Sequence, residues 1–293
     1  MKRSQITQTI LTLTLSLASP YVLCAQSPDA GKPKSDKGPD SSAVESINSD
    51  LIAARAATKE KRYADAEAIM LKVTADKPQM IVPWLELGLA QIGLKKYADA
   101  ESDFQIALGI DPKSDEIRHS DEYYRPNKPG VTKISRNTMG GYAINEQSRT
   151  PEIKGVGYSS LGEIYIRTKR IPEAQAAFDT AVKANPSQAA LYLRDETIFF
   201  FQVGNSEAQL TAAEKAIAVD PARPMLYYFK GQALASRATV DPKTQKLTLP
   251  PGCAESYRKY LEMEPNGQFA ADAKSFLTAA GIPVQSSGKT GKS

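Results

Sequence analysis

The chain repeats itself at a spacing of 34 residues, and this period limits its fold more than any other feature of the sequence. Four positions recur at that one offset, as the pairs Tyr63 and Tyr97, Ala66 and Ala100, Met70 and Phe104, and Pro78 and Pro112. A fixed offset of this length is typical of an array of similar units, each too small to bury its own apolar face. We therefore expect neighbouring units to stack and cover one another.

The residue types within a unit predict two antiparallel helices that cross closely. Small residues fit the crossing point, bulky residues fill the space beside it, and proline stops the second helix. The clearest copy carries Trp84, Leu87, Gly88, Ala100, Phe104 and Pro112. A second good copy carries Tyr158, Leu161, Gly162, Ala174, Phe178 and Pro186.

In these residues the chain resembles tetratricopeptide-repeat proteins, and the resemblance extends over about residues 43–281. It implies an all-α fold, a right-handed α-solenoid of helix-turn-helix repeats with a C-terminal capping helix. It also implies a scaffold that binds a protein partner, without enzymatic activity and without a cofactor. The fourth unit fits less well, because Thr197 stands in the glycine position and Gln209 in the alanine position.

Changes in composition and the positions of glycine and proline predict the borders of the segments along the chain. We expect a signal peptide (1–25), a flexible linker (26–42), repeats one and two (43–114), an insertion between repeats (115–154), repeats three to five (155–266), a capping helix (267–281) and a disordered tail (282–293). The fifth repeat contains a second insertion, 236–252, in which a small hairpin or a folded loop is expected.

The N-terminus predicts export to the periplasm or the cell exterior. Lys2 and Arg3 precede an uncharged run that ends in Leu23-Cys24-Ala25, which favours cleavage after Ala25. Two alternatives would bring the chain into contact with a membrane: an uncleaved segment that acts as an anchor, or a lipid on Cys24 that would make the protein a membrane-tethered envelope assembly factor.

The resemblance places a partner-binding groove along the first helices, where an extended peptide or a partner helix would bind. Residues beside the Trp and Gly positions line this groove, and they include Ser159, Glu163, Ile198 and Gln232. The contact candidates are Leu85, Leu89, Ile92, Ile166, Arg194, Phe201 and Tyr228. The competing interpretation is that several of them pack against neighbouring repeats, since apolar residues at helical spacing usually belong to a core.

Other chemistry finds little support in the sequence. The chain has one histidine, His119, so no metal site with two histidines can form, and a Ser-His-Asp triad could be built only around that residue, which lies in the insertion. With 37 basic and 33 acidic residues it has no basic stripe for nucleic acid. Cys253, the single cysteine left after cleavage, is expected to be a buried, unreactive thiol. An enzymatic or glycan-binding role would have to rest on the insertion at 115–154, around Tyr123, Tyr124 and Arg136.

Overall fold

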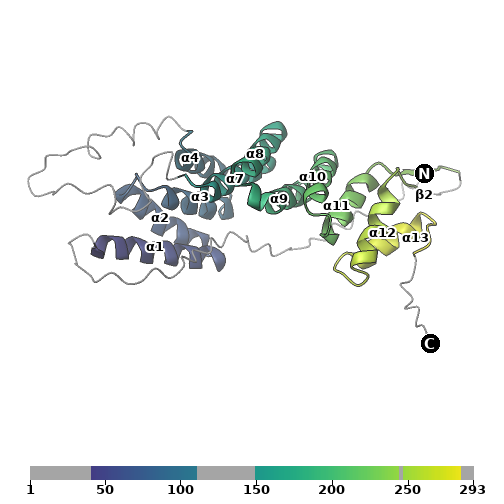
Figure 1. Ribbon diagram of the computed structural model, residues 1–293, viewed down its shortest axis with the longest axis horizontal. Coiled ribbons are helices and arrows are strands. Elements are labelled where there is room, and N and C mark those ends of the chain that lie inside the picture. The colour runs from purple at the N-terminus through teal and green to yellow at the C-terminus, as the bar shows by residue number, and fades with distance from the viewer. Residues whose placement is uncertain (1–40, 111–148, 244–246, 285–293) are drawn as a thin grey trace, which may run out of the picture.

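The computed structural model describes residues 41–110, 149–243 and 247–284, and these form an elongated array of helices (Figure 1). The predicted all-α solenoid with a capping helix is confirmed. The helices before the long insertion are α1 (Ser41–Lys59), α2 (Tyr63–Asp76), α3 (Ile81–Gly93) and α4 (Tyr97–Leu108). Those after it are α7 (Pro151–Arg167), α8 (Ile171–Ala184), α9 (Ala189–Gln202), α10 (Ser206–Val219), α11 (Pro224–Ala235), α12 (Cys253–Met263) and α13 (Ala270–Ala279), with a short 3-10 helix η2 (Pro186–Gln188).

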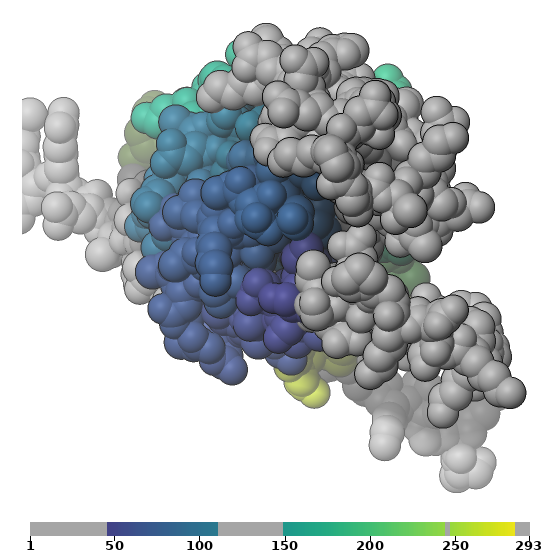
Figure 2. Space-filling view, turned by 90° about the vertical axis from the view of Figure 1, so that its left-hand side faces the viewer, coloured from purple at the N-terminus to yellow at the C-terminus, as the bar shows by residue number. Residues whose placement is uncertain are grey.

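The helices pack in consecutive pairs, and each pair has a first and a second helix. The first helices are α1, α3, α7, α9 and α11, and the second helices are α2, α4, α8, α10 and α12. Consecutive first helices contact one another directly, whereas second helices pack mainly on the first helices of the same and the next pair. Closer spacing marks the inside of a curve, so the first helices form the inner face. Figure 2 looks at the array from its N-terminal end, where residues of the first two pairs face the viewer.

The turn inside each of the first four pairs has the same backbone shape. One residue adopts a positive φ at the equivalent position of each turn: Lys61, Lys95, Lys169 and Gly204. The following N–H in each turn donates to a carbonyl five residues earlier, as Asn205 does to Phe200 at 3.0 Å. The fourth unit, which departs from the pattern in sequence, therefore makes the same turn as the others.

Glycine at the crossing point allows each pair to close. A Cβ on Gly88 would lie 2.8 Å from the Phe104 ring, and one on Gly162 would lie 2.5 Å from the Phe178 ring. Both rings are fully buried. In the fourth pair Thr197 takes the glycine position, and its Oγ1 donates to the Leu193 carbonyl at 2.8 Å, so its hydroxyl is satisfied within its own helix.

The long insertion does not break the stack. Helix α4 packs directly on α7, and the Leu108 side chain lies against Gly157. A Cβ on Gly157 would lie only 2.8 Å from that side chain. The buried Arg149 adds a link, because its Nε donates to the Ala107 carbonyl at 2.9 Å. Helix α7 begins at Pro151, inside the segment expected to be insertion, since Thr150 caps it and proline suits the first turn.

The C-terminal end is closed by aromatic side chains. Between α11 and α12 the expected hairpin is present, with β1 (Thr239–Val240) antiparallel to β2 (Leu247–Thr248). Beyond α12, the capping helix α13 covers a cluster in which Tyr228 stacks on Phe269, with ring centroids 4.1 Å apart. Ile282 and Val284, expected to lie in a disordered tail, also pack against this cluster.

Cys253 is a buried free thiol, as predicted. Its Sγ donates to the Gly231 carbonyl at 3.4 Å, and burial, helped by Glu255, raises the pKa of the thiol to about 11. A thiol that stays protonated at neutral pH is a poor nucleophile.

Several expectations concern parts of the chain outside the described residues. They are the signal peptide with Cys24, nearly all of the linker, Pro112, most of the 115–154 insertion with His119, Tyr123, Tyr124 and Arg136, and the tail beyond Val284. Among the helices that are described, none combines the length and the apolar character needed to cross a bilayer.

Candidate functional site

The seven groove candidates all lie on first helices, but they differ in exposure. Leu89 and Ile92 on α3 and Arg194 and Phe201 on α9 are half-buried and keep part of their surface accessible. By contrast, Leu85, Ile166 and Tyr228 are buried. A partner that approaches this face therefore meets the first four residues and not the last three.

The burial of the other three follows from contacts between repeats. Leu85 lies in one apolar cluster with Ile153 and Leu161, because α7 covers α3. The hydroxyl of Tyr228 donates to Asp272 of the capping helix at 2.8 Å. These residues hold the repeats together, as the packing interpretation expects.

Ile166 belongs to a different cluster, which is centred on the third and fourth pairs. It shares that cluster with Phe178, Tyr192 and Phe200. Phe200 is the fully buried member of the run of three phenylalanines, and its neighbours turn to either side of it. Phe199 lies 6.4 Å from Phe178, and Phe201 lies 4.9 Å from Phe229, measured between ring centroids.

Charged pairs accompany the apolar residues along the first helices. Near the N-terminal end, Arg55 on α1 bridges to Glu86 on α3 at 2.5 Å. Burial raises the pKa of Glu86, and the nearby Arg55 guanidinium opposes that shift. This bridge connects two consecutive first helices.

A second charged group lies at the middle of the array. Arg167 contacts Glu163 one turn earlier on α7 at 2.7 Å, and Arg194 contacts Asp195 on α9 at 2.8 Å. Burial raises the pKa of Glu163, Arg167 opposes the rise, and the Asp195 charge adds to it. Arg167 also lies over the Phe199 ring, 5.5 Å from its centroid, which is a cation–π geometry. We name Glu163, Arg167, Arg194 and Asp195 the charged quartet.

The arginines of the charged quartet are the parts of it that a partner can reach. About 22% of the Arg194 side chain and 31% of the Arg167 side chain remain exposed, whereas the paired carboxylates are more deeply buried. A guanidinium held by one carboxylate still has N–H groups to donate. The inner face thus combines accessible hydrogen-bond donors with the apolar surface of Leu89, Ile92 and Phe201.

The described residues form no group of three or more His, Cys, Asp or Glu side chains placed to hold a metal ion. The chemistry that this face offers is recognition through apolar contact, hydrogen bonds and charge.

The pattern of residues 157–188, which span most of α7 together with α8 and η2, matches the model of the tetratricopeptide repeat family. The chain contains a tetratricopeptide repeat. This repeat carries Glu163 and Arg167 on its first helix and the Gly162–Phe178 crossing between its two helices. No curated protein matches the sequence.

Several solved structures of tetratricopeptide-repeat proteins are similar to the chain. YrrB, a protein with an unusual peptide-binding site, has 13% identity and a TM-score of 0.46 over 81% of this chain and 98% of that one. The TPR2AB domain of yeast Sti1, in complex with pHSP90, has 13% identity and a TM-score of 0.32 over 81% and 90% of the two chains. The C-terminal part of a repeat protein from Cytophaga hutchinsonii has 13% identity and a TM-score of 0.32 over 78% and 87%.

Sequence reasoning missed half of the charged quartet. Glu163 and Arg194 were found because they lie beside the repeat positions, but Arg167 and Asp195 were not. The spacing of Glu163 and Arg167, four residues apart on one helix, is a signal that could have indicated the first pair. The proximity of Asp195 to Glu163 depends on how α9 packs on α7, for which the sequence has no comparable signal.

Proposed function

We propose that the protein is a non-enzymatic scaffold that binds a peptide or helix of a protein partner along the inner face of its first helices. The observation that carries this proposal is that Arg194, paired with Asp195, keeps about 22% of its side chain exposed on a first helix whose Phe201 is also partly exposed. An apolar strip with fixed polar donors suits a peptide, because side chains bury against the strip while backbone carbonyls accept hydrogen bonds.

Weakening this face without disturbing the core tests the proposal. The double variant Leu89→Gln with Arg194→Gln changes two half-buried residues on different helices. We expect crosslinking and affinity capture from the producing cells to recover about tenfold less of the bound proteins, since central apolar and arginine contacts dominate binding energies.

The matched control is Arg237→Gln, which removes the same charge at an exposed position just after α11. Its recovery of partners should equal that of the unchanged protein. Equal recovery by the double variant, with helix content and thermal unfolding like those of the control, would contradict the inner face as the binding site.

The proposed location of the protein is the periplasm or the cell exterior, and the N-terminal sequence supports this location. We expect mass spectrometry of the mature protein to find a free N-terminus at Gln26. A lipid attached to Cys24 would instead establish a membrane-tethered factor, and an intact Met1 would argue against cleavage altogether.

A further inference from the structure

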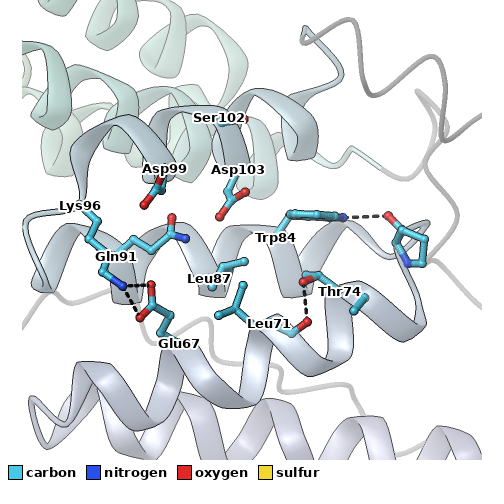
Figure 3. Close-up of a pocket in the computed structure, with 12 residues that line it drawn as sticks. Glu67, Leu71, Thr74, Trp84, Leu87, Gln91, Lys96, Asp99, Ser102 and Asp103 are labelled. Carbon is cyan, nitrogen blue, oxygen red and sulfur yellow. Dashed lines mark hydrogen bonds and ion pairs between the residues drawn. The ribbon is translucent and has the colours of Figure 1, made fainter.

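The outer side of the array has a groove that the inner-face proposal does not use. Its volume is about 670 Å³, its walls come from the second helices α2 and α4, and its floor comes from α3 (Figure 3). It lies within the first two pairs, away from the charged quartet on α7 and α9.

The floor and one wall of this outer groove are apolar. The Trp84 indole is fixed in place, because its Nε1 donates to the Pro78 carbonyl at 2.8 Å. Leu87 lies beside it on the floor, and Leu71 of α2 remains 50% exposed, which makes it one of the most exposed large apolar side chains described. An aromatic ring beside an exposed leucine offers a surface for an aliphatic chain.

The remaining lining residues give the outer groove a negative charge. Glu67 is paired with Lys96, whose Nζ lies 2.7 Å from its carboxylate, so these two charges cancel. Asp99 and Asp103 lie one turn apart on α4, and Figure 3 shows both carboxylates on the groove side. Asp99 is at an exposed position, so its carboxylate adds a negative charge that a basic group can reach from the outer groove.

Gln91 independently indicates that the outer groove can receive a hydrogen-bond donor. It lines the outer groove and is only 4% exposed, and its Oε1 has no hydrogen-bond partner among the described residues. Leaving a buried acceptor unsatisfied is unfavourable. In Figure 3 the Gln91 amide extends toward the Asp99 side of the outer groove.

We propose that the outer groove binds a lysine or arginine of a protein partner, flanked by apolar side chains. The aliphatic part of the basic side chain lies across Trp84 and Leu71, as long basic side chains do on apolar surface. Its charged end donates to the Asp99 carboxylate and to the Gln91 Oε1. This second contact lies on a different face from the inner-face site, so the two sites can fail or succeed separately.

The test uses short synthetic peptides and the fluorescence of Trp84, the single tryptophan of the chain. The probe is acetyl-Ala-Leu-Lys-Leu-Ala-amide, and matched peptides carry arginine, norleucine or glutamate in place of lysine. We expect the lysine and arginine peptides to change Trp84 fluorescence and to bind at least about tenfold more tightly than the norleucine peptide. We expect no binding of the glutamate peptide.

Two variants move the affinity in opposite directions. Asp99→Lys, at an exposed position, should abolish binding of the lysine peptide, whereas Lys96→Met should tighten it severalfold by leaving Glu67 unpaired. Glu262→Lys in α12 makes the same charge change at an exposed site far along the array and should leave binding unchanged.

Calorimetric titration repeats each measurement without relying on the Trp84 signal, and circular dichroism establishes that each variant is folded. Leu71→Gln, at its half-exposed position, replaces Asp99→Lys if that variant fails to fold. Equal affinity of the norleucine and lysine peptides, equal effects of Asp99→Lys and Glu262→Lys, or no binding of any peptide would each overturn the proposal.

Discussion

Replacing Glu196 by glutamine is expected to stabilise the protein by about 3 kcal/mol at pH 8 and by much less at pH 5. Glu196 lies on α9, is 1% exposed, and has no hydrogen-bond partner for its Oε2 among the described residues. Its surroundings supply two charges, Lys215 on α10 and Asp179 on α8, which are bridged to each other at 2.7 Å.

The pH dependence follows from the pKa of the Glu196 carboxyl. Burial raises that pKa to about 7 from an ordinary value of 4.5, Lys215 opposes the rise, and Asp179 adds to it. Between those two values the folded chain holds a proton that the unfolded chain has released, so stability falls as the pH rises through this window. Above pH 7 the full cost of the buried charge is present, and Glu196→Gln removes it.

Urea unfolding at pH 5 and pH 8, followed by circular dichroism, measures this difference. The gain from Glu196→Gln should be larger at pH 8 by about 2–3 kcal/mol. The control Glu262→Gln, at an exposed position, should show equal effects at the two pH values. A gain from Glu196→Gln that does not depend on pH would show that this carboxyl does not titrate in the window.

Removing the Phe178 ring is expected to have the largest effect of any single change considered. The ring is fully buried among Ile166, Tyr192 and Phe200, and it fills the crossing of α7 and α8. Phe178→Ala should lower the free energy of unfolding by about 3–5 kcal/mol, because truncating a packed aromatic leaves a cavity.

Gly162 offers a sharper test of the same crossing. Since a Cβ at this position would lie 2.5 Å from the Phe178 ring, Gly162→Ala alone should cost about 1–3 kcal/mol. In the Phe178→Ala background the clash is gone and alanine favours the helix, so the same change should be neutral or stabilising by up to about 1 kcal/mol. Denaturant unfolding of the unchanged protein, the two single variants and the double variant gives the coupling free energy between the two positions. Simple additivity of the two effects would contradict the close contact.

The candidate sites were less predictable than the repeats, and particular residues show why. The crossing residues Gly162 and Phe178 are separated by less than one repeat, so one 34-residue unit contains both contacting partners. Whether Leu85 or Tyr228 is exposed depends instead on the next helix in space, α7 for Leu85 and α13 for Tyr228. Those helices follow long stretches of chain, and no local pattern predicts how they pack.

The outer groove illustrates the same limit. The sequence identified Trp84 as a packing residue, and it does lie at the edge of two apolar clusters. Its second role, as the floor beneath Asp99 and Leu71, arises because α2 and α4 stand apart on the outer side of the curve. Neither the spacing of the repeats nor their composition specifies that separation.

The sequence by itself determined the helix pairs, their turns and the solenoid built from them, because these depend on residue size and spacing within a single period. Tertiary structure decided that repeats two and three stack across the long insertion, through Leu108 and Gly157. It also decided which residues of the first helices stay accessible and where an acidic groove forms on the outer side. Those properties arise between units, where contacts join residues far apart in the chain and burial depends on what the next helix covers.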